Sequence, residues 1–210
     1  MWVRVKICGI TTLDDALAAC EAGADALGFN FAPEAAAKGR RIAMEAARQI
    51  VDRLPPFVTT VGVVVNEAPE RIRTCLDFVD YVQFHGEETP DQCALFAART
   101  IKAFRTAPGV DLEDMLGYPA AAYLLDAFST RARGGTGVVS DWAVARKAVE
   151  SGQCIILAGG LTPDNVAEAV RTVRPYAVDV SRGVEHAPGR KDHEKMRRFI
   201  RAAKAACVDP

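Results

Sequence analysis

The sequence has almost no net charge and no long apolar run. Its 26 lysines and arginines are balanced by 27 aspartates and glutamates, leaving a formal charge of −1 over 210 residues. A chain without a basic field does not attract nucleic acid or an anionic membrane surface through its overall charge. No apolar window in the sequence is long enough to cross a bilayer. We therefore expect no nucleic-acid partner and no membrane partner.

Patterns typical of metal sites and disulfide frameworks are also missing. The six cysteines are scattered without Cys-x-x-Cys spacing, and the three histidines show no metal-ligand spacing. The first residues alternate in polarity and lack the apolar core of a signal peptide. Reduced, unpaired cysteines are typical of the cytoplasm. The sequence therefore predicts a cytoplasmic protein without a metal site.

What the sequence does contain is a regular alternation of short β-rich runs with helical or loop segments. Several of these runs are almost continuously apolar, as is typical of parallel strands covered by helices. The predicted strands are residues 3–8, 26–31, 58–65, 81–84, 100–105, 122–126, 154–158 and 177–181. Eight strands alternating with helices, with no linker or break in composition, predict a single-domain α/β protein over residues 1–210, a (β/α)8 TIM barrel. Such a domain would bury roughly 70% of the surface of its unfolded chain.

Helix signals lie between the predicted strands. Thr12 is a candidate N-cap for the first helix, since acidic residues follow it in the first turn. The pair Thr162-Pro163 predicts an N-cap and a first-turn proline for the helix after the seventh strand. Gly23 and Gly152 stand where a glycine would end a helix. These signals agree with helices that follow the strands in sequence.

Two strand-then-glycine units stand near the C-terminal end of the sequence. Ile155-Ile156-Leu157-Ala158 leads into Gly159-Gly160, and Ala177-Val178-Asp179-Val180 leads into Ser181-Arg182-Gly183. A barrel of this class builds its phosphate site from backbone N–H groups at this place in the chain. Glycines also simply end strands. Two such turns in succession nevertheless favour a phosphorylated small-molecule substrate.

Two residues suited to proton transfer end other strands, where barrel active sites assemble. Cys8 ends the first strand and, with period-two alternation, shares a face with Lys6. If the intervening apolar residues face the helices, Lys6 and Cys8 point into the barrel. Asp126 directly follows the apolar end of the sixth strand. A lone cysteine is more often an inert apolar side chain, and an acid after a strand is often a cap, so both alternatives stay open.

Two long loops should lie on the same rim of the barrel. The loop after the second strand contains Arg40 and Arg41, and either guanidinium could bind a carboxylate through two parallel hydrogen bonds. Exposed arginines are more often simply solvated. The loop after the sixth strand contains Gly134-Gly135-Thr136-Gly137, which fits a lid or an anion-binding nest. Loops on this rim of a barrel usually carry function.

Taken together, these pieces resemble the phosphoribosylanthranilate isomerase family of tryptophan biosynthesis over nearly the whole chain. The resemblance implies an Amadori rearrangement of an aminoaldose phosphate to an aminoketose phosphate by general acid–base catalysis. It implies no metal and no cofactor, since the iminium intermediate is itself the electron sink. The motifs that carry it are Lys6-Ile7-Cys8-Gly9-Ile10, Gly28-Phe29-Asn30-Phe31, Gln83-Phe84-His85-Gly86, Asp126 with Gly134-Gly135-Thr136-Gly137, Asp141-Trp142, Ala158-Gly159-Gly160-Leu161, and Asp179-Val180-Ser181-Arg182-Gly183-Val184-Glu185.

By motif position, the resemblance implies that Cys8 is the general base and Asp126 the general acid. Arg40, rather than Arg41, is the best match for the arginine that holds the anthranilate carboxylate, although the stretch 34–39 is lengthened. We expect Lys6 to lower the pKa of Cys8, and His85 to pack or to support a neighbouring site residue rather than take part in catalysis directly. The residues that match the phosphate site are Gly159, Gly160, Ser181, Arg182 and Gly183.

The sequence departs from the family pattern at two further positions. Arg182 stands where the family commonly has a second serine, and Val138 replaces a lysine often found after the glycine loop. The pattern leaves open a monomer or a homodimer. It also leaves two alternative functions: another phosphosugar barrel isomerase or lyase, and a non-catalytic barrel that binds a phosphorylated metabolite.

Overall fold

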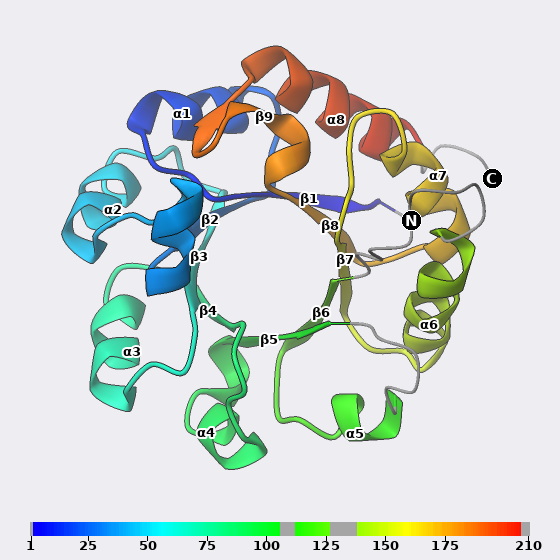
Figure 1. Ribbon diagram of the computed structural model, residues 1–210, viewed down its shortest axis with the longest axis horizontal. Coiled ribbons are helices and arrows are strands. Elements are labelled where there is room, and N and C mark those ends of the chain that lie inside the picture. Colours follow the sequence, from blue (N-terminus) through cyan, green and yellow to red (C-terminus); the bar gives the residue numbers. More distant parts are fainter. Residues whose placement is uncertain (1, 106–111, 127–137, 207–210) are drawn as a thin grey trace.

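Eight parallel strands form a closed barrel in sequence order (Figure 1). The computed structural model describes residues 2–105, 112–126 and 138–206. The ring closes through β1, which pairs in parallel with both β2 and β8. The predicted barrel is therefore confirmed, and every observed strand lies within its predicted range. The strands are β1 Arg4–Cys8, β2 Ala26–Asn30, β3 Thr59–Val64, β4 Tyr81–Phe84, β5 Thr100–Arg105, β6 Ala122–Asp126, β7 Ile155–Ala158 and β8 Ala177–Val180.

Helices surround this barrel (Figure 1). Thr12 caps α1 as predicted, since its side chain accepts a hydrogen bond from the backbone of Asp15. The prediction for the helix after β7 is wrong. Residues 162–165 form a turn in which the Thr162 backbone donates to the Asn165 side chain, and α7 begins only at Val166, three residues after Pro163. The helices are α1 Leu13–Glu21, α2 Met44–Val51, α3 Pro69–Leu76, α4 Pro90–Ala94, α5 Leu112–Leu116, α6 Val138–Glu150, α7 Val166–Val173 and α8 His193–Ala205.

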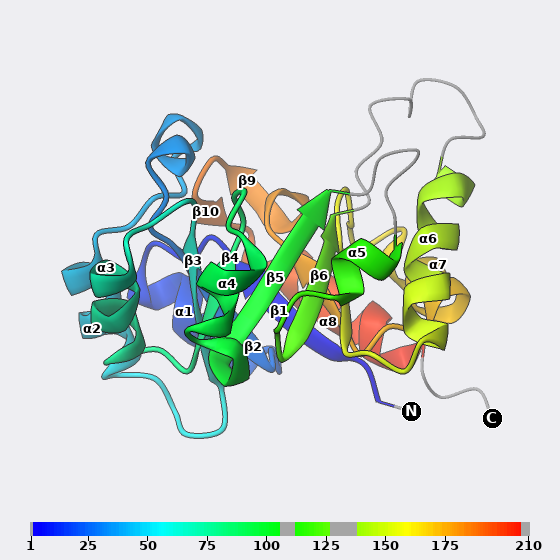
Figure 2. The same ribbon diagram turned by 90° about the horizontal axis from the view of Figure 1, so that it is seen from below.

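Short elements decorate the rim formed by the C-terminal ends of the strands. The 3₁₀ helix η1, Pro33–Lys38, follows β2, and η3, Arg182–Val184, follows β8. An antiparallel hairpin of β9, Glu185–Ala187, and β10, Arg190–Lys191, then stands between β8 and α8. Figure 2 shows η1 and this hairpin on the same side of the barrel. The hairpin was not predicted from the sequence.

Two apolar layers hold the barrel together. One buried cluster fills the barrel interior and includes Leu124 and Ile156, and a larger one, including Leu125 and Phe199, packs strands against helices. Side chains alternate along each strand, so the inward face of β6 continues from Leu124 to Asp126. The barrel interior is therefore apolar along most of its length and polar at the C-terminal rim.

The opposite rim carries exposed aromatic side chains. Trp2 and Phe57 stand two residues before β1 and β3, and Tyr176 directly precedes β8. These three residues are 79%, 103% and 39% exposed, respectively. Because all eight strands are parallel, these residues share the N-terminal rim. Figure 2 shows the start of β1 and the loop after α2 on this side of the barrel. In the part of the chain that is described, no helix combines the length and the apolar character needed to span a membrane.

Candidate active site

A buried ion pair lies inside the barrel mouth next to Cys8. Lys6 and Asp179 are register partners on β1 and β8, and Lys6 Nζ lies 2.7 Å from Asp179 Oδ1. A Cβ on Gly28 of β2 would lie 2.8 Å from Cys8 Sγ and 3.0 Å from Lys6 Nζ. Glycine at position 28 therefore leaves the space that both side chains occupy. The prediction that Lys6 and Cys8 point into the barrel is confirmed.

Burial and nearby charges act on the Cys8 thiol in opposite directions. Burial raises the pKa of Cys8 above its ordinary value, and this outweighs the lowering effect of the Lys6 ammonium. Burial by itself would lower the pKa of Lys6, but its ion pair with Asp179 raises it, so Lys6 is charged. The predicted effect of Lys6 on Cys8 therefore has the right sign and is too small to dominate.

Asp126 lies at the same rim as Cys8. It ends β6 on the inward face, and its register partners are Arg105 on β5 and Ala158 on β7. His85 follows β4 on this rim, and its pKa is lowered by burial, an effect that the charges of Asp126 and Asp179 partly oppose. A polar group formed by Cys8, Lys6, Asp179, His85 and Asp126 thus occupies the barrel mouth.

His85 is held by a residue of the strand that precedes it. The side-chain nitrogen Nε2 of Gln83 lies 2.9 Å from Nδ1 of His85, and Gln83 is buried inside the barrel. The lowered pKa keeps the imidazole neutral at neutral pH. The ring is packed, as expected, and it also lies within electrostatic reach of both carboxylates at the mouth.

Of the two neighbouring arginines, Arg40 reaches the mouth. A Cβ on Gly9 would lie 3.4 Å from Arg40 Cδ and 3.0 Å from Ser181 Oγ, which places Arg40 beside the turn that follows Cys8. Its guanidinium pairs with Glu185 through Nε at 2.8 Å and Nη2 at 2.6 Å. Arg41 is exposed and forms an isolated bridge with Asn30 at the end of β2. The preference for Arg40 over Arg41 stays a prediction that this placement favours.

The two predicted glycine turns lie side by side, because β7 and β8 are paired. Gly159 and Gly160 have φ values of 91° and 64°, a region that strains L side chains. A Cβ on Gly183 would overlap the carbonyl oxygen of Leu161, so only glycine permits the two turns to approach this closely. The Arg182 side chain is exposed.

Ser181 offers a hydroxyl group at this place. Its Oγ is buried and has no hydrogen-bond partner within the described ranges. Buried hydroxyl groups are rarely left unsatisfied, so an unpaired one beside two glycine turns fits the expected anion site. The loop Gly134-Gly135-Thr136-Gly137 lies outside the described residues.

Three charged residues at the mouth were not assigned a role from the sequence. Asp179 had a usable signal, because a carboxylate in the middle of an apolar strand requires a buried partner. Glu185 and Lys191 are buried in the unpredicted hairpin, and Lys191 Nζ lies 3.0 Å from Glu185 Oε1. No period or spacing in the sequence indicates that these side chains turn toward Arg40.

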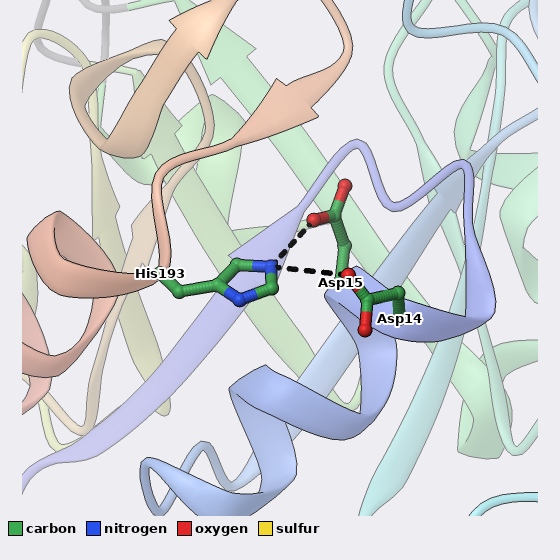
Figure 3. A group of neighbouring side chains, drawn as sticks. All are labelled: Asp14, Asp15 and His193. Atoms are coloured by element: carbon green, nitrogen blue, oxygen red, sulfur yellow. Dashed lines mark hydrogen bonds and ion pairs between the residues drawn. The ribbon is translucent and has the colours of Figure 1, made fainter.

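One cluster has the composition of a metal site. Ligand atoms of Asp14, Asp15 and His193 lie within 4.8 Å of one another (Figure 3). However, both oxygens of Asp15 are already engaged, one by His193 Nε2 at 2.9 Å and the other by the Lys191 backbone at 3.2 Å. The cluster therefore links α1 to α8 and the hairpin, and we assign it no metal.

The fold and the polar groups at its mouth define the chain as a (β/α)8-barrel enzyme. A family model described as N-(5′-phosphoribosyl)anthranilate (PRA) isomerase matches residues 5–202. N-(5′-phosphoribosyl)anthranilate isomerase of Trichlorobacter lovleyi is 54% identical, over 97% of this chain and 99% of its own. The chain therefore belongs to the N-(5′-phosphoribosyl)anthranilate isomerase family, and the resemblance stated from the motifs is confirmed.

Solved structures agree with this assignment. A phosphoribosyl anthranilate isomerase in complex with reduced 1-(o-carboxyphenylamino)-1-deoxyribulose 5-phosphate is 45% identical, with a TM-score of 0.85 over 97% of this chain and 99% of that one. A structure of monomers generated from the dimeric enzyme of Thermotoga maritima is 42% identical, with a TM-score of 0.84 and the same coverage.

Proposed function

We propose that the chain converts N-(5-phosphoribosyl)anthranilate to 1-(2-carboxyphenylamino)-1-deoxyribulose 5-phosphate in tryptophan biosynthesis. The observation that carries the proposal is the relative solved with the reduced form of this product, which shares this barrel at 45% identity over almost the whole chain. The placement of Cys8 and Asp126 at the ends of β1 and β6, on one rim, supports an acid–base pair.

In the proposed first step, Asp126 donates a proton to the ring oxygen of the ribose. The C1′–O bond breaks, and the nitrogen lone pair forms an iminium. Arg40 binds the anthranilate carboxylate, and the turns at Gly159-Gly160 and Ser181-Arg182-Gly183 bind the phosphate. Binding at both ends of the substrate holds the reacting carbons near the catalytic groups, which is where much of the rate enhancement arises.

In the proposed second step, the Cys8 thiolate removes the proton on C2′. The electrons of the C–H bond move into the iminium and form an enolamine, which tautomerises to the ketone. Because burial raises the pKa of Cys8, its thiolate is scarce at neutral pH. The positive charges of Lys6 and Lys191 counteract this and favour the thiolate.

The activity is tested with the fluorescence of freshly prepared phosphoribosylanthranilate. A catalytic amount of the purified chain should abolish the anthranilate-type fluorescence of a large excess of substrate. A non-catalytic barrel would change the signal only up to one equivalent. Another phosphosugar isomerase or lyase would leave the signal unchanged while converting its own substrate.

We also propose that the chain is a homodimer formed through its N-terminal rim. The supporting observations are the exposed Phe57 and Trp2, both on the N-terminal rim, together with the dimeric relative from Thermotoga maritima. Large exposed aromatics on one face are typical of protein interfaces. Sedimentation should show a dimer for the wild type and a monomer for Phe57→Glu, whereas a monomeric wild type would contradict this.

We further propose that residues 1–210 form a single domain and that the protein is cytoplasmic.

A further inference from the structure

We propose that Glu185 is the positioning residue for Arg40, fixing the guanidinium at the barrel mouth so that its free edge meets the carboxylate of the substrate. This inference rests on the proposed function, because it assigns a partner to the arginine that would hold the anthranilate. Glu185 contacts neither substrate nor the reacting atoms in this proposal. It acts through Arg40.

The geometry of the pair leaves one edge of the guanidinium for a ligand. Glu185 accepts from Nε and Nη2 of Arg40, which is the side-on arrangement of an arginine–carboxylate pair. A guanidinium has five N–H donors in a fixed plane. Within the described residues, the side-chain hydrogen bonds of Arg40 use Nε and Nη2 alone. The edge formed by Nη1 and the second hydrogen of Nη2 can therefore take a second carboxylate.

Lys191 sets the charge of this group. Its ammonium lies 3.0 Å from Glu185 and 3.3 Å from the carbonyl oxygen of Ser181, and its side chain is fully buried. Two cations and one anion leave a single positive charge. That charge matches one substrate carboxylate. Without Glu185, two cations would repel each other in a buried site, and nothing would hold Arg40 in place.

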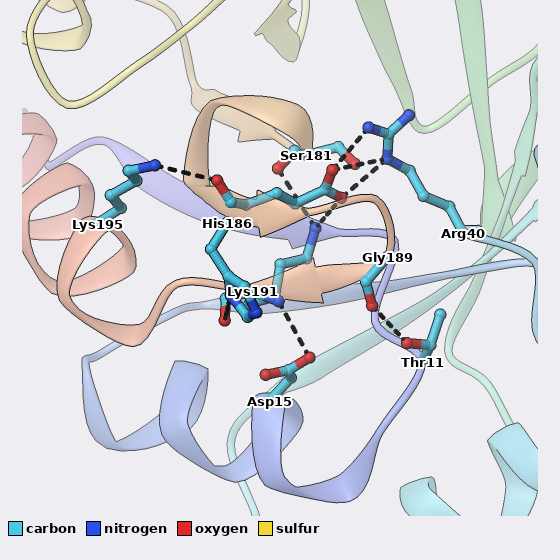
Figure 4. A network of polar contacts seen from close by, with 9 residues as sticks. Thr11, Asp15, Arg40, Ser181, His186, Gly189, Lys191 and Lys195 are labelled. Atoms are coloured by element: carbon cyan, nitrogen blue, oxygen red, sulfur yellow. Dashed lines mark hydrogen bonds and ion pairs between the residues drawn. The ribbon is translucent and has the colours of Figure 1, made fainter. Parts of the chain in front are cut away.

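The hairpin that carries Glu185 and Lys191 is anchored by hydrogen bonds to residues on three of its sides (Figure 4). Thr11 donates to the carbonyl of Gly189, Asp15 accepts from the backbone of Lys191, and Lys195 donates to the carbonyl of Glu185. The bonds to Asp15 and Lys195 fix the two ends of the hairpin to α1 and α8, and Thr11, in the loop before α1, holds its turn. Glu185 is thus held rigidly, whereas Arg40 reaches it from the separate loop after β2. A rigid anion that orients a long, otherwise mobile side chain is what positioning requires.

The experiment measures binding of two probes to the full chain. One probe is reduced 1-(o-carboxyphenylamino)-1-deoxyribulose 5-phosphate, and the other is its counterpart made from aniline, which lacks the carboxyl group. Glu185→Gln should lower the affinity for the carboxylated probe by about 10- to 100-fold. It should leave the affinity for the aniline probe unchanged. Steady-state kinetics should show the same loss in KM rather than in kcat. Glu70→Gln, which removes an exposed acid of an i,i+3 pair on α3, is the matched control.

Two further variants separate positioning from general destabilisation. Glu185→Gln leaves Lys191 buried without its anion, so the double variant Glu185→Gln/Lys191→Met removes both charges together and should fold. It should lose affinity for the carboxylated probe in the same way. In an Arg40→Ala background, Glu185→Gln should cause no further loss, because there is no guanidinium left to position.

The outcomes distinguish the two proposals. If Glu185→Gln weakens both probes equally, or if its effect adds fully to that of Arg40→Ala, the positioning role is wrong while the proposed function stands. If the wild type neither binds the carboxylated probe nor isomerises phosphoribosylanthranilate, the proposed function is wrong, and this inference fails with it.

Discussion

Lys6 and Asp179 are register partners on β1 and β8, and their ion pair of 2.7 Å lies inside the barrel directly beside Cys8. The thiol therefore sits next to a cation that favours its ionisation and an anion that opposes it. Burial dominates both, so the pKa of Cys8 is raised. This arrangement makes the reactivity of Cys8 depend on pH in a direction that can be tested.

The alkylation rate of Cys8 by iodoacetamide should rise with pH through an apparent pKa above the ordinary value of a thiol. Lys6→Met should raise that pKa further, because it removes a cation that lowers it and leaves Asp179, which raises it. Lys191 still lowers it in the variant. Peptide mass spectrometry follows Cys8, with Cys20 on α1 as the internal control. An identical pH profile for Cys8 in both proteins would remove the proposed role of Lys6.

Replacing either proposed proton-transfer group should remove most of the turnover and leave the fold intact. Cys8→Ala and Asp126→Asn should each lower kcat by about 10²- to 10⁴-fold, the usual contribution of such a group. Stopped or continuous fluorescence assays measure kcat, and circular dichroism verifies the fold. Cys20→Ala and Asp77→Asn, on α1 and at the end of α3, are the matched controls. Near-normal turnover in Cys8→Ala or Asp126→Asn would reject that residue's role.

Arg40→Ala should mainly weaken substrate binding. Loss of a charge-assisted hydrogen-bonded pair costs about 1.5–3 kcal/mol, which corresponds to roughly 10- to 100-fold in KM. The value of kcat should change little if the carboxylate is bound equally in ground and transition states. Arg41→Ala is the control and should leave KM unchanged, since Arg41 is exposed and forms a bridge with Asn30. A large fall in kcat at constant KM would contradict this role for Arg40.

Gly183→Ala should disturb the proposed phosphate site. Its Cβ would overlap the carbonyl oxygen of Leu161, so the turns after β7 and β8 must separate. We expect a loss of about 1–3 kcal/mol in the free energy of unfolding, together with weaker competitive inhibition by inorganic phosphate. Gly152→Ala is the control, since it has a φ of 82° but open space around its Cβ. If phosphate inhibition is the same in both variants, the turn at Gly183 does not bind phosphate.

The elements that follow from local pattern were predicted well. Each strand of the barrel is buried on both faces, so it is visible in the sequence as a short apolar run. The predicted bounds of β4, β5 and β6 match the observed bounds without change. The start of α7 was missed because Thr162-Pro163 also favours a turn. The Asn165 side chain accepts a hydrogen bond from the Thr162 backbone and so stabilises a turn where the first helical residues were predicted.

The hairpin after β8 shows the limit of local pattern. Its two strands are only three and two residues long, too short for a period to be visible. Glu185 and Lys191 read as surface charges in sequence. In the structure they are among the most buried charged side chains of the described residues, because they pair with each other and Glu185 also pairs with Arg40, 145 positions away.

The sequence by itself determined the barrel, the rim on which the site lies, and the candidate acid, base and glycine turns. Strand alternation places each inward residue, and parallel strands bring all C-terminal ends to one side. Only the tertiary structure decided which charges meet there. Lys6 with Asp179, and Arg40 with Glu185, are ion pairs across long sequence separations, and the energy of burying them depends on distances that closure of the barrel creates.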